Sequence, residues 1–164
     1  MIRLGLIVAL LTLLADQASK WWILDVLRLP ELVNVPLLGG ETIGLDLTMV
    51  WNRGVTFGLL SGDGTWHHWV LAALAMAIAA FLLRWLAKAE TRLVAVALGG
   101  VIGGAVGNVI DRVRFGAVVD FVDFHVAGWH WYVFNVADAA IVCGVVALVA
   151  DSLLRPAPKP QPEP

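Results

Sequence analysis

The stretch LVAVALGGVIGGAVGNVIDR, residues 93–112, decides how this chain of 164 residues folds. Leu93–Ile110 carries no charge and is long enough to cross the apolar core of a membrane as a helix. Its glycines recur at intervals of four, as 99–103–107 and 100–104, and such strips of small residues let helices pack closely. The stretch ends in Asn108, Asp111 and Arg112, which share one helix face at positions i, i+3 and i+4.

The composition extends this membrane assignment to the rest of the chain. Hydrophobic residues make up 60% of the sequence and charged residues 15%, against about 45–50% and about 25% in soluble domains. We therefore expect an integral membrane protein with one domain over residues 1–155. The net charge of −2 gives no indication of nucleic-acid binding. The single cysteine, Cys143, lies in an apolar run and is predicted to be a small buried residue.

The predicted fold is mainly α-helical, with four transmembrane helices. The four apolar runs are Leu4–Leu24, Trp66–Leu86, Leu93–Ile110 and Trp131–Leu154. Tryptophans lie at their ends, as in the aromatic belts of membrane proteins. The short connection between the second and third runs carries Arg84, Lys88 and Arg92, and cytoplasmic loops are enriched in such cations. We expect both termini to be cytoplasmic.

A small extracytoplasmic β-sheet is predicted between helices 1 and 2. Thr42–Trp51 alternates between apolar and polar residues, which indicates a half-buried strand. The region around Val33 and Leu37 alternates similarly, and Pro36 favours a place at the sheet edge. We place this β insertion at about residues 25–64. The proline-rich segment 156–164 is predicted to be a disordered cytoplasmic tail.

Four carboxylates lie inside or at the ends of the apolar runs: Asp16, Asp111, Asp120 and Asp138. An ionisable group at membrane depth costs about 3 kcal/mol on insertion scales, so its presence indicates function. Polar partners stand within one helical turn of three of them: Lys20 for Asp16, Asn108 and Arg112 for Asp111, and Asn135 for Asp138.

Several of these residues also have plain structural interpretations. Asp16 and Lys20 can form an interfacial ion pair that only anchors the first helix. Asn52 and Gly54 indicate a tight turn, in which Asn52 either caps the turn or binds the backbone of a substrate. Asp123 follows Asp120 in an extended segment but faces the other side, and we expect it to be a solvated loop carboxylate.

Other common chemistries lack their motifs in this sequence. No serine has a nucleophile-elbow context, no His-Glu-x-x-His is present, and no dinucleotide fingerprint appears. We therefore expect no metal and no cofactor. Two carboxylates within about 3 Å of each other share one proton. One can then act as base toward a water and the other as acid toward a scissile carbonyl.

Five motifs follow one another along the chain. They are Asp16-Gln-x-Ser-Lys20, Asn52-x-Gly-x-x-Phe-Gly58, Gly103-Gly-x-x-Gly-Asn108-x-Ile-Asp111-Arg112, Val118-Val-Asp120-Phe-x-x-Phe124 and Phe134-Asn135-x-Ala-Asp138. In this order and spacing they resemble the bacterial lipoprotein signal peptidase family, signal peptidase II. One departure is Thr56, which stands where alanine is usual.

The resemblance implies a multi-pass aspartyl endopeptidase of the bacterial inner membrane. It would remove the signal peptide of diacylglyceryl-modified prolipoproteins just upstream of the lipidated cysteine, at the extracytoplasmic side. The family's catalytic pair maps to Asp120 and Asp138. Residues for substrate binding or site support map to Asp16, Lys20, Asn52, Gly54, Asn108, Asp111, Arg112 and Asn135. The resemblance also implies membrane lipid as a partner and inhibition by the cyclic peptide globomycin, and we expect a monomer.

Two other function classes fit parts of the pattern. Intramembrane carboxylates also line the paths of transporters and proton-coupled channels. Four spans are few for such a protein, and the acidic groups gather at one end. A structural membrane subunit would need only the glycine strips.

Overall fold

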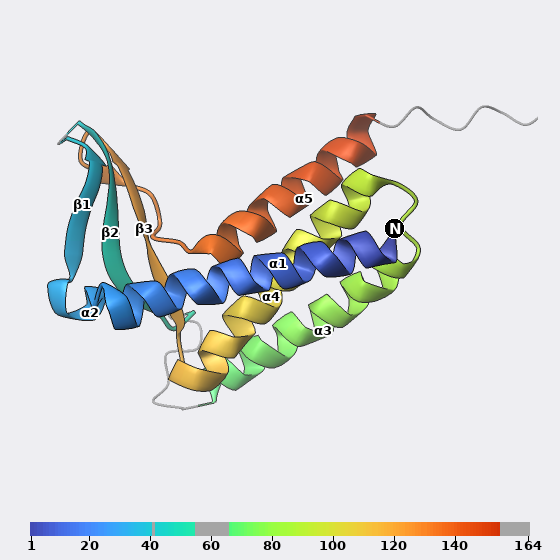
Figure 1. Cartoon of the computed structure of the whole chain (residues 1–164), viewed down its shortest axis with the longest axis horizontal. Helices are drawn as coiled ribbons and strands as arrows, with labels where there is room; N and C mark the ends of the chain where they lie inside the picture. Colours follow the sequence, from blue (N-terminus) through green and yellow to red (C-terminus); the bar gives the residue numbers. More distant parts are fainter. Residues whose placement is uncertain (41, 55–65, 155–164) are drawn as a thin grey trace, which may run out of the picture.

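The computed structural model describes residues 1–40, 42–54 and 66–154. Within these ranges, four helices are long and apolar enough to cross a membrane: α1 (Ile2–Trp21) with its π-helical extension η1 (Trp22–Val26), α3 (His67–Ala87), α4 (Arg92–Phe115) and α5 (Val136–Leu154). They form an up-and-down bundle (Figure 1). The four predicted spans are confirmed. However, α5 begins at Val136 and not at Trp131, because the chain before it is extended and Phe134 pairs with Val122.

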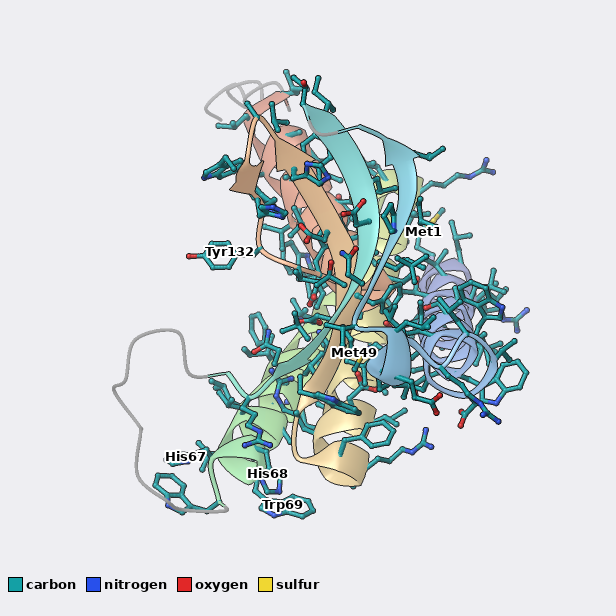
Figure 2. All side chains as sticks on the ribbon, turned by 90° about the vertical axis from the view of Figure 1, so that its left-hand side faces the viewer. Met1, Met49, His67, His68, Trp69 and Tyr132 are labelled. Carbon is teal, nitrogen blue, oxygen red and sulfur yellow. The ribbon has the colours of Figure 1, made fainter. Side chains whose placement is uncertain are left out.

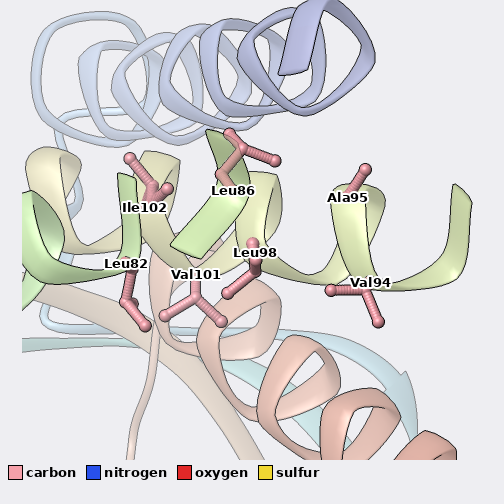
Figure 3. Packing of buried hydrophobic residues seen from close by; sticks show 7 residues of the cluster. All are labelled: Leu82, Leu86, Val94, Ala95, Leu98, Val101 and Ile102. Carbon is pink, nitrogen blue, oxygen red and sulfur yellow. The ribbon is translucent and has the colours of Figure 1, made fainter. Parts of the chain in front are cut away.

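The central helix of the bundle is α4. Of its most apolar 18-residue window, 67% is buried inside the protein, compared with 11% to 17% for the other three spans. Leu82 and Leu86 of α3 pack against Leu98, Val101 and Ile102 of α4 in the main apolar cluster (Figure 3). The other helices therefore surround α4 and leave their outer faces to lipid. Cys143 is exposed on α5, so the prediction that it is buried was wrong.

The glycines of α4 form two packing strips, one against α1 and one against α5. A β-carbon on Gly99 or Gly103 would overlap backbone carbonyls of α1, and one on Gly104 would overlap the Ala137 carbonyl of α5. Only glycine permits helices to approach this closely. The predicted role of the strips is thus confirmed.

An antiparallel sheet lies at one end of the bundle (Figure 1). Its strand order is β1 (Asn34–Gly39), β2 (Ile43–Asn52), β3 (Val118–Val126) and β4 (Trp129–His130). The predicted strand over Thr42–Trp51 is confirmed as β2. The prediction was incomplete in one respect, because β3 and β4 come from the connection between α4 and α5. In the register of this sheet, Val50 lies opposite Asp120 and Asn52 opposite Val118.

A second apolar cluster fastens the sheet to the end of the first span. Ile23 of η1 and Leu29 of the short helix α2 (Leu29–Leu32) pack with Leu47 of β2 and with Val119 and Phe121 of β3. All five side chains are buried. Because Val119 and Phe121 flank Asp120 along β3, this packing fixes that carboxylate relative to the helices.

Aromatic side chains surround this end of the protein. Figure 2 looks onto the sheet and shows His67, His68 and Trp69 at the start of α3, and Tyr132 pointing outward from the segment after β4. Tyr132 is 77% exposed, and Trp129 and Trp131 are also exposed. Such a set is typical of the membrane–water interface. The predicted tail at 156–164 and the motif positions 55–58, with Thr56, lie outside the described residues.

We expect Gly103→Ala to destabilise the bundle, because the added methyl would meet the Ala9 carbonyl and the Thr12 side chain of α1. Overpacking of this kind costs about 1–3 kcal/mol. Gly100→Ala is the matched control, since its β-carbon would lie 3.5 Å from the Ala140 carbonyl, an ordinary contact. Unfolding temperatures in detergent compare the two, and an equal loss in both variants would contradict this packing.

Candidate active site

The predicted site residues meet where the sheet joins the helices. They come from the ends of α1, β2 and α4, from β3 and from the start of α5. Hydrogen bonds and ion pairs link all of them into one network: Asp16, Lys20, Asn52, Gly54, Asn108, Asp111, Arg112, Asp120, Asn135 and Asp138. The structure therefore brings together every predicted site residue.

Asp120 is the third residue of β3 and is 1% exposed. Asn52 Nδ2 donates to its Oδ2 at 2.9 Å, and Asn135 Nδ2 donates to its Oδ1 at 2.7 Å. Burial raises the pKa of Asp120 to about 6, and the nearby charge of Asp138 acts in the same direction. The two amide donors and Lys20 act against this rise by stabilising the ionised form. Asp120 can therefore exchange a proton near neutral pH.

Asp138 lies in the first turn of α5. Its backbone N–H donates to Asn135 Oδ1 at 2.9 Å, and the Asn135 backbone N–H donates to Asp138 Oδ2 at 3.3 Å. This reciprocal arrangement is a capping box, and it starts the helix at this point. Asn108 Nδ2 donates to the other carboxylate oxygen at 2.8 Å. Asp138 is only half-buried, so one side of it remains accessible.

Asn135 connects the two carboxylates directly. Its side-chain amide donates to Asp120 and its backbone amide donates to Asp138. The same side chain also reaches the Asn108 Oδ1 atom and the Val119 carbonyl, and it is fully buried. Asn135 therefore contacts both carboxylates. Its spacing in the sequence predicted a contact with Asp138 only.

Asn52 both caps a turn and reaches the candidate site. The Gly54 N–H donates to Asn52 Oδ1 at 2.9 Å, and Gly54 has a φ of 76°, which a side chain would strain. The Nδ2 atom of Asn52 is thereby aimed at Asp120. The turn interpretation of Asn52 is confirmed, and binding of a substrate backbone by Asn52 stays a prediction.

Lys20 is the centre of a buried ionic cluster and is 2% exposed. Its Nζ lies 2.8 Å from Asp16 Oδ2, 2.7 Å from Asp111 Oδ2 and 3.3 Å from Asn108 Oδ1. The ion pair predicted between Asp16 and Lys20 is thus present, but it is buried and shared with α4. Arg112 stands beside this cluster, where its Nη1 donates to the Asn108 carbonyl and its charge faces Asp138, Asp111 and Asp120.

Asp123 contradicts its prediction as a solvated loop carboxylate, because it is 5% exposed. The Thr48 hydroxyl donates to its Oδ2 at 3.0 Å, and His130 Nδ1 lies 3.0 Å from its Oδ1. The alternation argument also turned Asp123 away from Asp120, which stays a prediction. It missed the neighbouring strands β2 and β4, which cover this side chain and supply its partners.

Gln17 also belongs to the network. It stands in the first sequence motif, but no role was predicted for it. Its Nε2 contacts both Asp16 and Asp111. The signal for it was an amide inside an apolar run, next to a carboxylate.

Among the described residues, no group of three or more His, Cys, Asp and Glu side chains is arranged to hold a metal ion. The available chemistry is proton exchange by Asp120 and Asp138, two carboxylates that each accept hydrogen bonds from neighbouring amide groups.

Comparisons with known proteins agree on one family. A model of the family described as signal peptidase (SPase) II matches residues 8–154. A lipoprotein signal peptidase of Methylorubrum extorquens (strain PA1) is 49% identical, over 96% of this chain and 89% of its own length. One of Rhodopseudomonas palustris (strain TIE-1) is 47% identical, over 93% of each chain. A solved structure, described as a bacterial membrane enzyme studied by the in meso method, is similar with a TM-score of 0.75, 26% identity and coverage of 93% of this chain and 94% of the other.

We expect Asp123→Asn to lower the free energy of unfolding by about 1.5–3 kcal/mol, since it removes hydrogen bonds to a buried charged group. Asp46→Asn is the matched control. Asp46 lies opposite Asp123 in the register, but it is more exposed and its His125 contact is 3.6 Å long. Reversible unfolding in detergent measures both variants, and a larger loss for Asp46→Asn would refute the importance of the Asp123 contacts.

Proposed function

Because the chain belongs to the signal peptidase II family, we propose that Asp120 and Asp138 are the catalytic pair of this membrane protease. The family processes prolipoproteins, and the protein is an aspartyl endopeptidase that removes signal peptides from diacylglyceryl-modified prolipoproteins. The observation that carries the assignment of the pair is the position of Asn135, which donates one hydrogen bond to each of the two carboxylates.

The two carboxylates divide the acid and base roles. Asp120 is the more buried and has the raised pKa, so it holds the shared proton before reaction. Asp138 is half-buried, starts ionised and takes a proton from a water. That water attacks the scissile carbonyl carbon while Asp120 gives its proton to the carbonyl oxygen. The tetrahedral intermediate then collapses: the C–N bond breaks, Asp138 gives the proton that it took to the leaving amine, and one hydroxyl of the intermediate returns its proton to Asp120.

The remaining network residues position this pair and its substrate. Asn108 orients Asp138, and Asn52 orients Asp120 from the turn at Gly54. Asp16, Lys20 and Asp111 support the pair as a buried ionic cluster, and Arg112 places a cation beside the pair. No metal or cofactor takes part in this mechanism. We further propose that the cyclic peptide globomycin inhibits this protein.

The membrane orientation follows from where the cations lie. The start of α1, the end of α5 and the connection between α3 and α4 lie at the end of the bundle away from the sheet (Figure 1). That connection and its flanks carry Arg84, Lys88 and Arg92. The positive-inside rule puts this end in the cytoplasm. The sheet and the catalytic pair then face the extracytoplasmic side of the inner membrane, in a monomer whose single domain covers residues 1–155.

Asp120→Asn and Asp138→Asn should each abolish cleavage of a diacylglyceryl prolipoprotein by purified protein. Asparagine keeps the size of aspartate but cannot exchange the catalytic proton. The double variant should be little worse than either single variant, because the pair acts as a unit. Asp123→Asn is the matched control on the same strand and should retain most activity in its folded fraction. A folded Asp120→Asn or Asp138→Asn protein that cleaves the prolipoprotein at near the wild-type rate would refute the proposed mechanism.

The pH dependence of kcat/KM tests the role of Asp120. Since the protonated form is active, kcat/KM should fall as pH rises through the pKa of Asp120 at about 6. Asn52→Ala removes a donor that stabilises the ionised form, so the pKa should rise and the alkaline limb should move to higher pH. Thr48→Val is the control on the same strand, because Thr48 contacts Asp123. A limb that stays in place or moves to lower pH in Asn52→Ala would contradict the assignment.

A further inference from the structure

Two buried carboxylates that do no chemistry in the proposed mechanism hold the backbone next to the catalytic pair. Asp16 Oδ1 accepts the backbone N–H of Ala137 at 3.0 Å, and Ala137 directly precedes Asp138. Asp111 Oδ2 accepts the backbone N–H of Val119 at 3.2 Å, and Val119 directly precedes Asp120. Each catalytic residue therefore follows a backbone amide that a carboxylate of another element fixes.

These two carboxylates are themselves fastened to each other. Lys20 Nζ lies 2.8 Å from Asp16 and 2.7 Å from Asp111. Gln17 Nε2 donates to Asp16 Oδ2 at 3.1 Å and to Asp111 Oδ1 at 3.1 Å. One cation and one amide of α1 thus join an acid of α1 to an acid of α4. We call Asp16, Gln17, Lys20 and Asp111 the clasp.

The helix packing around the clasp leaves it little freedom. Asp16, Lys20 and Asp111 are buried, and Gln17 also donates to the Gly107 carbonyl at 3.3 Å. A β-carbon on Gly107 would overlap the Asp16 carboxylate, so glycine at this position lets Asp16 lie against α4. Two carboxylates share one lysine here, and leaving a buried charge unpaired is strongly unfavourable. The clasp is therefore a rigid connection between the start of α5 and the start of β3.

We propose that the clasp sets the separation between Asp120 and Asp138, with Gln17 as a positioning residue of the reaction. This inference rests on the proposed function, because it takes Asp120 and Asp138 as the catalytic pair. The separation of two carboxylates determines how strongly the charge of one opposes ionisation of the other. A looser clasp should therefore bring the two ionisations of the pair closer together on the pH axis.

The test compares the pH profiles of kcat/KM for Gln17→Ala and Asp16→Asn with that of the wild type. We expect kcat to fall by about 10-fold to 100-fold, as for displaced catalytic groups, while KM changes less than about twofold. The acid and alkaline limbs should approach each other by about one pH unit. The quantity to measure is the separation of the two limbs on the pH axis, because loss of the Asp16 charge moves both limbs in the same direction. A purely structural defect would reduce the active fraction and leave this separation unchanged.

Ser19→Ala is the matched control on the same helix turn. Its hydroxyl donates only to the Asp16 carbonyl, outside the clasp, so both limbs should stay in place. Gln17→Ala keeps the ion pairs of Lys20 and decides the test if Asp16→Asn fails to fold. In the pair Gln17→Ala and Asp111→Asn, the combined loss of kcat should be smaller than the product of the single losses, because both act through one clasp.

Wild-type separation of the limbs in folded Gln17→Ala, or the same narrowing in Ser19→Ala, would overturn the inference. Multiplicative losses in the double variant would also overturn it. These results differ from failure of the proposed function, in which Asp120→Asn or Asp138→Asn would stay active. Inactive catalytic variants combined with an unchanged profile in Gln17→Ala would keep the proposed function and reject the clasp.

Discussion

The site depends on the two ion pairs that Lys20 makes at the end of the first span. Lys20 is withdrawn from solvent and pairs with Asp16 on its own helix and with Asp111 on the central helix. A buried ion pair of this kind contributes little net stability compared with apolar packing, but breaking it is costly. Its consequence here is geometric, because Asp16 also holds the backbone amide that precedes Asp138, and Asp111 holds the one that precedes Asp120.

The helix bundle brings these groups within reach through small residues. Gly99, Gly103 and Gly107 let α1 approach α4, and Gly104 lets α5 approach from another side. The sheet then closes the site from the end of the bundle, with Asp120 on β3 paired against β2. Polar groups that would be costly in lipid are thus enclosed between three helices and a sheet, and every one of them finds a partner within the described chain.

Much of this arrangement could be predicted from sequence because its signals are local. Span length, glycine spacing and the alternation over Thr42–Trp51 depend on residues close together in the chain. The misses concern contacts between distant segments. That β3 extends the sheet, and that β2 supplies a partner to Asp123, depends on pairing across 75 residues, as in the 3.0 Å bond from the Thr48 hydroxyl to Asp123. The bridging role of Gln17 required the position of α4, which the sequence of α1 does not contain.

The central claim is that Asp120 and Asp138 share one proton. Infrared spectroscopy of the purified protein at about pH 5, below the raised pKa of Asp120, detects protonated carboxyl groups through their carbonyl band. We predict one such band in the wild type that is lost in Asp120→Asn and shifted or lost in Asp138→Asn, while Asp123→Asn keeps it. A band that persists unchanged in both catalytic variants would show that neither residue holds the proton, and would contradict the account.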